Sequence, residues 1–171
     1  MSFLELAKSR YSVRDFSDKP VELEKLDLIL EAGKIAPTAK NNQPQKVYVV
    51  QSEEGIAKLN ELTRCIYGAK TVILVCKDTE LEWNNPLEEG ITSGDTDVGI
   101  VVTHMMLEAW ELGIASCWVG FFPPTETQKA FDLPENEIPV ALLPIGYAAE
   151  GVEPAPRHTL YRDGAKEVKS L

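Results

Sequence analysis

Two segments near the N-terminus carry apolar residues at the spacing of amphipathic helices. Residues 3–10 form the first and residues 22–35 the second, with Pro20 and Pro37 marking the ends of the longer segment. Their apolar positions are Phe3, Leu4, Leu6, Ala7, Leu23, Leu26, Ile29, Leu30, Ala32 and Gly33. The pattern therefore predicts two helices before any strand.

The next elements predicted are a strand, a helix and a second strand. Val47–Val50 is a short β-branched and aromatic run, typical of a strand. Ser52, followed by two glutamates, predicts an N-cap and a helix to about Thr63, because acidic side chains favour the first helical turn. Thr71–Cys76 is continuously apolar between polar neighbours, as expected of a central buried strand.

A long polar connection, residues 78–93, separates this strand from the most apolar helix of the chain. A loop of this length in a compact domain is usually functional or mobile. Asp95 or Thr96 is expected to cap the helix, which runs to about Leu112 before Gly113 stops it. Its apolar positions surround most of its surface, which predicts a central, buried helix.

The remaining pattern predicts a strand at 116–119, a short helix at 125–131 and a last strand at 140–147. Beyond residue 150 the chain has few apolar residues, so we expect an extended tail. Helices and strands alternate without a strict strand–helix–strand rhythm. The fold class predicted is α+β: a three-layer sandwich in which helices flank a mixed sheet, with residues 1–171 forming a single domain.

The charge balance narrows the classes of partner. The chain has 17 lysine and arginine residues against 27 acidic residues, which gives a formal net charge of −10. Apolar residues make up 44% of the chain and charged residues 26%, which are ordinary values for a globular protein. Such a chain does not suit nucleic acid or an anionic membrane, which require a basic surface. Positive charge is scarce, so the close pair Arg10 and Arg14 becomes informative, although both could simply be surface residues near a helix end.

Cysteine and histidine usage indicates a cytoplasmic protein without a metal site. Cys65, Cys76 and Cys117 show no C-x-x-C spacing, and no apolar run reaches the about 18 residues of a membrane span. His104 and His158 lie far apart and outside any acidic cluster, so neither is predicted to bind metal or to be catalytic. Cys117 has no histidine and acid at a motif-like spacing, which disfavours a thiol nucleophile.

Two polar stretches carry the candidate chemistry. Residues 10–14, RYSVR, place two guanidiniums and a hydroxyl together, a donor set suited to phosphate. Residues 36–44, APTAKNNQP, offer amides that can form hydrogen bonds with the edge of a planar heterocycle. Together they indicate a phosphorylated, ring-bearing cofactor.

These stretches, in this order, resemble the R-x-S-x-R and P-S-x-x-N-x-Q-P-W motifs of the nitroreductase family of FMN-dependent oxidoreductases. The resemblance continues through Asp97-Val98-Gly99 and residues 112–121, LGIASCWVGF, and ends at Pro156-Arg157, covering roughly residues 3–160. Two positions depart from the family pattern. Gln45 replaces an aromatic residue, and Ala155 stands where relatives carry a lysine, which implies weaker FMN binding.

The resemblance implies a set of cofactor-binding residues and a homodimer. Arg10, Ser12 and Arg157 match positions that gather the FMN phosphate and ribityl oxygens, and Arg14 matches a basic position near the ring's N1/O2 edge. The partner subunit is expected to contribute the loop that holds Asn41, and the tail from about residue 150 to wrap that subunit. The full set expected to bind FMN is Arg10, Tyr11, Ser12, Arg14, Pro37, Thr38, Ala39, Asn41, Trp118, Val119, Gly120 and Arg157.

Backbone amides of the 118–120 segment are expected near flavin N5, although Trp118 could equally be a core residue. Arg64 is a weaker candidate for facing the ring, and no catalytic side chain is predicted. Larger family members use the region before the long helix for helices that cover the active site, and the shorter 78–93 connection of this chain implies an open ring face.

The function implied is hydride transfer from NAD(P)H through FMN to a small organic acceptor (a nitroaromatic, quinone or flavin) by a ping-pong cycle. The alternatives are an FMN-binding module without turnover and a different flavin reaction on the same scaffold.

Overall fold

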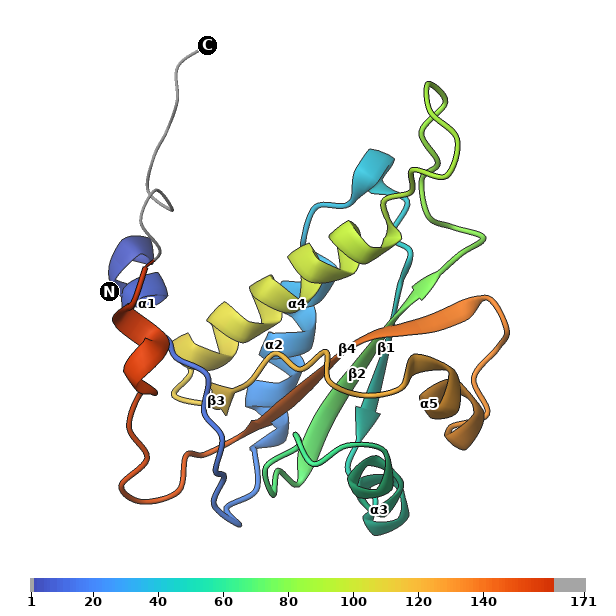
Figure 1. The fold of residues 1–171 in the computed structure, drawn as a ribbon. Coiled ribbons are helices and arrows are strands. Elements are labelled where there is room, and N and C mark those ends of the chain that lie inside the picture. Colours follow the sequence, from blue (N-terminus) through green and yellow to red (C-terminus); the bar gives the residue numbers. More distant parts are fainter. Residues whose placement is uncertain (1, 162–171) are drawn as a thin grey trace.

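The computed structural model describes residues 2–161, and its elements follow the predicted order (Figure 1). Within that range the five predicted α-helices and four predicted strands are confirmed. The α-helices are α1 (Phe3–Ser9), α2 (Leu23–Lys34), α3 (Glu53–Leu62), α4 (Gly94–Glu111) and α5 (Pro124–Ala130). The strands are β1 (Gln45–Val50), β2 (Thr71–Asp78), β3 (Ala115–Ser116) and β4 (Glu137–Gly146). Two short 3-10 helices, η1 (Ala39–Asn41) and η2 (Pro156–Thr159), were not predicted.

The four strands form one sheet in the order β1-β2-β4-β3, and every neighbouring pair is antiparallel. The prediction of a mixed sheet is therefore wrong for these strands. For β1 and β2 the reason lies in the connection through α3. Val50 at the end of β1 pairs with Val72 at the start of β2, so the connection leaves and re-enters the sheet at the same end, and the two strands run in opposite directions. In residues 2–161 the only parallel pairing is the isolated bridge between Ser12 and Ser116.

The sheet is the middle of three layers, as predicted. Alternate residues of β2 point to opposite faces: Ile73 and Val75 join the core under α2 and α4, while Val72 and Leu74 join the core on the side of α3 and α5. Figure 1 shows α2 and α4 on one face and α3 and α5 at the other. All four β2 side chains have no exposed surface, which confirms a central buried strand.

Helix α4 packs closely on α2 and ends where the sequence predicts. A Cβ placed on Gly33 would clash with the Met105 side chain, so this glycine lets the two helices approach. Gly113, at φ 74°, ends α4 in the left-handed conformation that glycine adopts without strain. The N-terminus differs from the prediction: Ser93 occupies the N-cap position, not Asp95 or Thr96.

The 78–93 connection begins at a tightly held carboxylate. Asp78 is 4% exposed; its oxygens accept hydrogen bonds from Asn136 Nδ2 (2.8 Å) and Glu80 N (3.0 Å) and face Lys46 Nζ at 3.2 Å. Burial alone would raise the pKa of Asp78, but these hydrogen bonds and the lysine outweigh it and hold the pKa below its ordinary value. Asp78 thus ties β1 and the 134–137 turn to the end of β2.

We expect Asp78→Asn to remove an acid-sensitive part of the stability. Because the folded pKa is lowered, the carboxylate's contribution is present above the unfolded pKa of about 3.9 and is lost as pH falls through the folded pKa. The substitution should lower the free energy of unfolding by about 1–2 kcal/mol at pH 7, and this difference should shrink below about pH 4. Urea unfolding at pH 7, 5, 4 and 3 measures it.

Asp18→Asn is the matched control, because the Asp18 side chain is 93% exposed in its pair with Lys70. Exposed pairs contribute little, so this variant should follow the wild-type pH profile. A difference between Asp78→Asn and wild type that stays constant from pH 7 to pH 3 would contradict the assignment.

Candidate functional site

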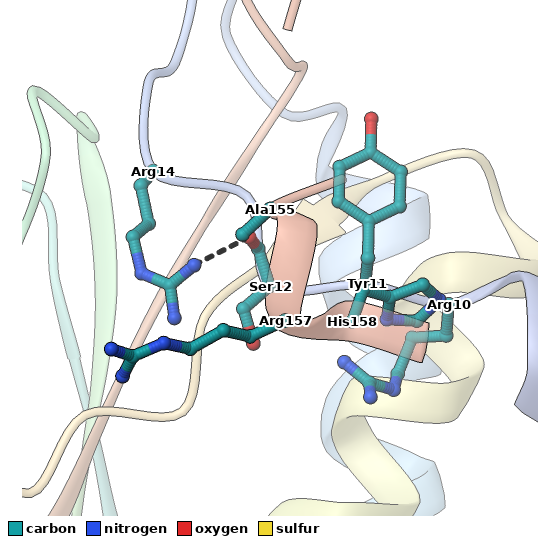
Figure 2. Close-up of a pocket in the computed structure, with 7 residues that line it drawn as sticks. All are labelled: Arg10, Tyr11, Ser12, Arg14, Ala155, Arg157 and His158. Carbon is teal, nitrogen blue, oxygen red and sulfur yellow. Dashed lines mark hydrogen bonds between the residues drawn. The ribbon is translucent and has the colours of Figure 1, made fainter. Parts of the chain in front are cut away.

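A cavity of about 160 Å³ lies where the chain leaves α1 and meets the C-terminal tail (Figure 2). This cavity, which we call the arginine cavity, is lined by Arg10, Tyr11, Ser12, Arg14, Ala155, Arg157 and His158. Five of these residues belong to the predicted cofactor set, and Ala155 is one of the two positions that depart from the family pattern. The fold therefore brings the two ends of the chain together at the site that was expected to hold a phosphate.

The local backbone directs the polar side chains of residues 10–14 toward this cavity. Beyond Arg10 the chain is extended and runs beside β3, with Val13 N donating to Ser116 O at 3.0 Å. Val13 is completely buried, so its neighbours Ser12 and Arg14 point the opposite way, as successive residues of an extended chain do. The alternation of polar and apolar residues in this stretch is what presents the donors together.

The tail reaches the cavity by packing on its own chain through Tyr11. The Tyr11 hydroxyl donates to Val152 O at 3.1 Å, and its ring meets the His158 ring edge-on at 6.2 Å between centroids. Residues 156–159 form η2, so the prediction of an extended tail is wrong there. Exchange of the tail with a partner stays a prediction, and residues 162–171 lie outside the described residues.

The cavity's positive charge is not neutralised within the described chain. In residues 2–161 every ion pair is made by a lysine, so no carboxylate pairs with Arg10, Arg14 or Arg157. Figure 2 shows the guanidinium groups of Arg14 and Arg157 on the same side of Ser12, and Arg14 Nη1 donates to Ser12 O at 3.3 Å. Three guanidiniums, a hydroxyl and no lining carboxylate suit a compact, doubly charged anion such as a phosphate monoester.

Cys117 is close to this charge but is not an activated thiol. Burial raises its pKa, and the opposing effects of the Arg14 charge, a Ser12 hydrogen bond and the Arg10 charge do not reverse the shift. The thiol therefore stays protonated at neutral pH, which agrees with the rejection of a nucleophilic role from sequence.

The predicted ring-edge loop lies elsewhere. Ala39 and Asn41 begin and end η1, and Pro37 and Thr38 precede it. This loop lies at the N-terminal end of α4, whereas the arginine cavity lies near the C-terminal end of that helix (Figure 1). An 18-residue helix is about 27 Å long. One chain thus does not bring the phosphate residues and the loop residues together.

The third predicted segment, residues 118–120, crosses the sheet edge beyond β3. Trp118 is 39% exposed, which excludes a simple core role, and its ring covers Gly120, where a Cβ would come within 3.0 Å of it. Val119 is buried, and its N–H donates to Leu142 O at 2.9 Å, so it is not available to a ligand. Among the described residues the Gly120 amide has no such partner.

A second cavity, of about 320 Å³, adjoins Gly120. It is lined by Leu62, Gly120, Phe121, Phe122 and Pro123. The Arg64 guanidinium lies 6.0 Å from the centroid of the exposed Phe121 ring. Arg64 thus stands near the 118–120 segment but does not line the arginine cavity.

Sequence reasoning missed His158 and Asp97 as site residues. His158 lines the arginine cavity, and its only sequence signal is its place next to Arg157. Asp97 was noted as part of a motif, and the structure shows that it holds the η1 loop through Ala39 N at 2.9 Å. In the part of the chain described, no three His, Cys, Asp or Glu residues gather as a metal site would require, and no helix is long and apolar enough to cross a membrane.

Comparison with known proteins places these features in a family. The family model described as "Nitroreductase family" matches residues 7–67 and 63–147. The chain is 42% identical to a nitroreductase family protein of Clostridium difficile 630, whose crystal structure superposes with a TM-score of 0.92 over 100% of both chains. A protein of Exiguobacterium sibiricum 255-15, crystallised in complex with FMN, is 25% identical over 99% of this chain and 98% of its own, with a TM-score of 0.80.

A curated relative extends the comparison to a named activity. The protein named FMN reductase [NAD(P)H] from Bacillus subtilis strain 168 is 30% identical over 164 residues, which cover 85% of this chain and 66% of its own length. The family model spans most of the chain, including the residue 10–14 stretch, η1 and the 118–120 segment. On this evidence, the chain belongs to the nitroreductase family.

Proposed function

We propose that the protein binds FMN without a covalent bond and acts as an NAD(P)H-dependent oxidoreductase that reduces a small organic acceptor. The acceptor classes expected are nitroaromatics, quinones and flavins. The observation that carries the proposal is the cavity lined by Arg10, Arg14 and Arg157, none of which pairs with a carboxylate in residues 2–161. The family, the relative named FMN reductase and the FMN-bound neighbour support it.

The residues of the cavity fit the cofactor's phosphate end. Arg10 and Arg157 would hold the dianionic phosphate by charge-assisted hydrogen bonds, and the Ser12 hydroxyl would bind a phosphate or ribityl oxygen. Arg14, from the same strand-like stretch, would place positive charge at the N1/O2 edge of the ring. FMN bound there would supply the redox chemistry, which is hydride transfer from NAD(P)H to the acceptor in a ping-pong cycle.

The surroundings of the 118–120 segment fit a ring with one open face. Within the described residues the Trp118 and Gly120 amides of that segment have no backbone partner, unlike the Val119 amide, and the adjoining apolar cavity offers room for a planar acceptor. Hydride transfer depends on stacking geometry more than on side-chain acids and bases. This agrees with the absence of a predicted catalytic side chain.

A second copy of the chain would complete the site. The 37–41 loop lies about a helix length from the arginine cavity of its own chain, so we infer that it serves the cavity of a partner. Large apolar side chains are exposed on α1 and α2, and α4 carries a mostly apolar hollow of about 280 Å³ formed by Thr96, Gly99, Ile100, Thr103 and His104. Such surfaces on a small acidic protein favour a homodimer. The exposed apolar residues of α1, of α2 and of the position after α2 are Phe3, Leu4, Leu23, Leu28 and Ile35.

The direct test of function is anaerobic reduction of the purified protein. We expect a yellow preparation, or a colourless one that becomes yellow with added FMN, whose absorbance near the flavin band bleaches with NADH or NADPH and recovers with an acceptor. A bound flavin that never bleaches would favour the binding module or another flavin reaction. A protein that cannot take up FMN would overturn the proposal.

The arginine cavity yields a quantitative prediction. Arg10→Ala and Arg157→Ala should each weaken FMN binding by about 1.5–3 kcal/mol, the range for a hydrogen bond to a charged group, which corresponds to roughly ten- to hundredfold in Kd. Titration of FMN fluorescence measures it. Lys129→Ala on α5, which removes an exposed lysine paired with Glu126, is the control and should leave Kd unchanged. Unchanged affinity in Arg10→Ala would show that the phosphate binds elsewhere.

Dimeric completion of the site can be tested with mixed dimers. Arg10→Ala damages the cavity, and Asn41→Gly removes a loop side chain while glycine accepts the φ of 57° at that position. If the loop acts on the partner's cavity, a dimer of one chain of each kind holds one intact site and one doubly damaged site. Differently tagged chains, purified together, should bind FMN tightly at half of the sites, whereas neither homodimer should.

The alternatives give different results in the same experiment. A loop that acts within its own chain leaves every site of the mixed dimer damaged, and no tight binding appears. A monomer in sedimentation that still holds FMN would also contradict the homodimer.

A further inference from the structure

Asp97 is a buried carboxylate that joins three segments of the chain. It is 2% exposed and lies in the first turn of α4. One carboxylate oxygen, Oδ1, accepts from the backbone N–H of Ala39 at 2.9 Å, and the other, Oδ2, accepts from the Ser93 hydroxyl at 2.7 Å. No ion pair within residues 2–161 includes Asp97, so these hydrogen bonds are what compensates its removal from water.

Through Ala39, Asp97 holds a segment, residues 40–43, whose backbone conformation is locally unfavourable. Lys40, Asn41 and Gln43 have φ values of 51°, 57° and 53°, in the left-handed region that residues other than glycine seldom adopt. Such conformations persist where surrounding contacts determine them. Besides Asp97, the Thr38 hydroxyl contributes by accepting from Gln43 N at 3.0 Å.

The Ser93 end connects the same carboxylate to the 78–93 loop. The Ser93 hydroxyl accepts from Trp83 N at 3.1 Å, and Ser93 N donates to Trp83 O at 3.0 Å. The loop also meets η1 directly, because Asn42 Nδ2 donates to Leu81 O at 3.0 Å. Asp97 is therefore the buried centre of a hydrogen-bond network, and η1 and the 78–93 loop are its two outer parts.

We propose that Asp97 is a positioning residue that holds residues 38–41 in the shape required to meet the flavin ring. The inference rests on the proposed function, and it also explains why the first turn of α4 carries a buried carboxylate. Asp97 itself does not contact the cofactor. It accepts one N–H of a strained loop, and the loop presents Thr38 and Asn41.

The first measurement concerns the loop without any flavin. In the apo protein, amide hydrogen exchange at Ala39 should be at least tenfold faster in Asp97→Ala than in wild type, because its acceptor is gone. Exchange of β2 and β4 amides should stay within about threefold, which separates a local effect from general destabilisation. Asp97→Asn keeps an oxygen that accepts from Ala39 N, so it should restore most of the protection.

The second measurement is FMN affinity by fluorescence titration. Asp97→Ala should raise Kd at least tenfold, and Asp97→Asn should stay within about threefold of wild type. Asp95→Ala is the matched control, because Asp95 lies two residues earlier in the same turn, is 70% exposed and pairs only with Lys77. It should change neither Ala39 exchange nor Kd.

Ser93→Ala gives an independent variant that keeps the carboxylate but removes the donor to Oδ2, together with the acceptor of Trp83 N. It should shift Ala39 exchange and FMN Kd in the same direction as Asp97→Ala, by a smaller factor, and it decides the question if Asp97→Ala does not fold. Unchanged exchange and Kd in Ser93→Ala and Asp97→Ala would overturn the inference, as would faster Ala39 exchange with unchanged Kd. A wild-type protein that does not bind FMN would instead overturn the proposed function, and the apo exchange result would still stand as a test of the link.

Discussion

The burial of α4 against the sheet and α2 determines where everything else lies. Its inward side chains pack on Ile73 and Val75 of β2 and on Leu143 of β4, and each fully buried side chain of this size contributes about 1.5–3 kcal/mol. The buried positions include Val98, Val101, Val102, Met105 and Ala109. The helix cannot shift without exposing this surface, so the positions of its two ends are fixed. The Asp97 hydrogen-bond network lies at one end, and the contact between Tyr11 and Trp110, with ring centroids 5.1 Å apart, lies at the other.

Lysine and arginine side chains are used differently in this acidic chain. The chain carries −10 overall, and in residues 2–161 its lysines make all of the ion pairs. Three of its few arginines are instead placed around one cavity without a carboxylate. Lysine pairs on the surface contribute little and are replaceable, whereas arginine provides a planar donor group that suits phosphate. An acidic surface with one unneutralised cationic cavity favours selective binding of a small anion there.

Local patterns predicted the elements, and non-local contacts account for what they missed. Helical spacing and capping residues located α1 to α5, because these signals lie within one element. Strand direction depends on where a connection returns, which the pairing of Val50 with Val72 decides and no local pattern reveals. The same holds for the site: motif residues identified Arg10 and Arg157, but their meeting depends on Tyr11 binding Val152, 141 residues away. The role of Asp97 was likewise invisible, since its partner Ala39 is 58 residues away.

The fold shows where the family lysine that Ala155 replaces would lie. Ala155 lines the arginine cavity, so the missing ammonium is missing from the site itself and not from a distant surface. The phosphate would then depend on guanidiniums from two separate stretches, residues 10–14 and Arg157. The second is placed by the tail, which packs on Tyr11 and lies 3.4 Å from Lys8 O at His158 Nε2. We therefore expect cofactor affinity in this chain to depend on tail docking more strongly than in a relative with an additional cation. Loosening the contact between Tyr11 and Val152 should weaken FMN binding even though neither group is expected to touch the phosphate.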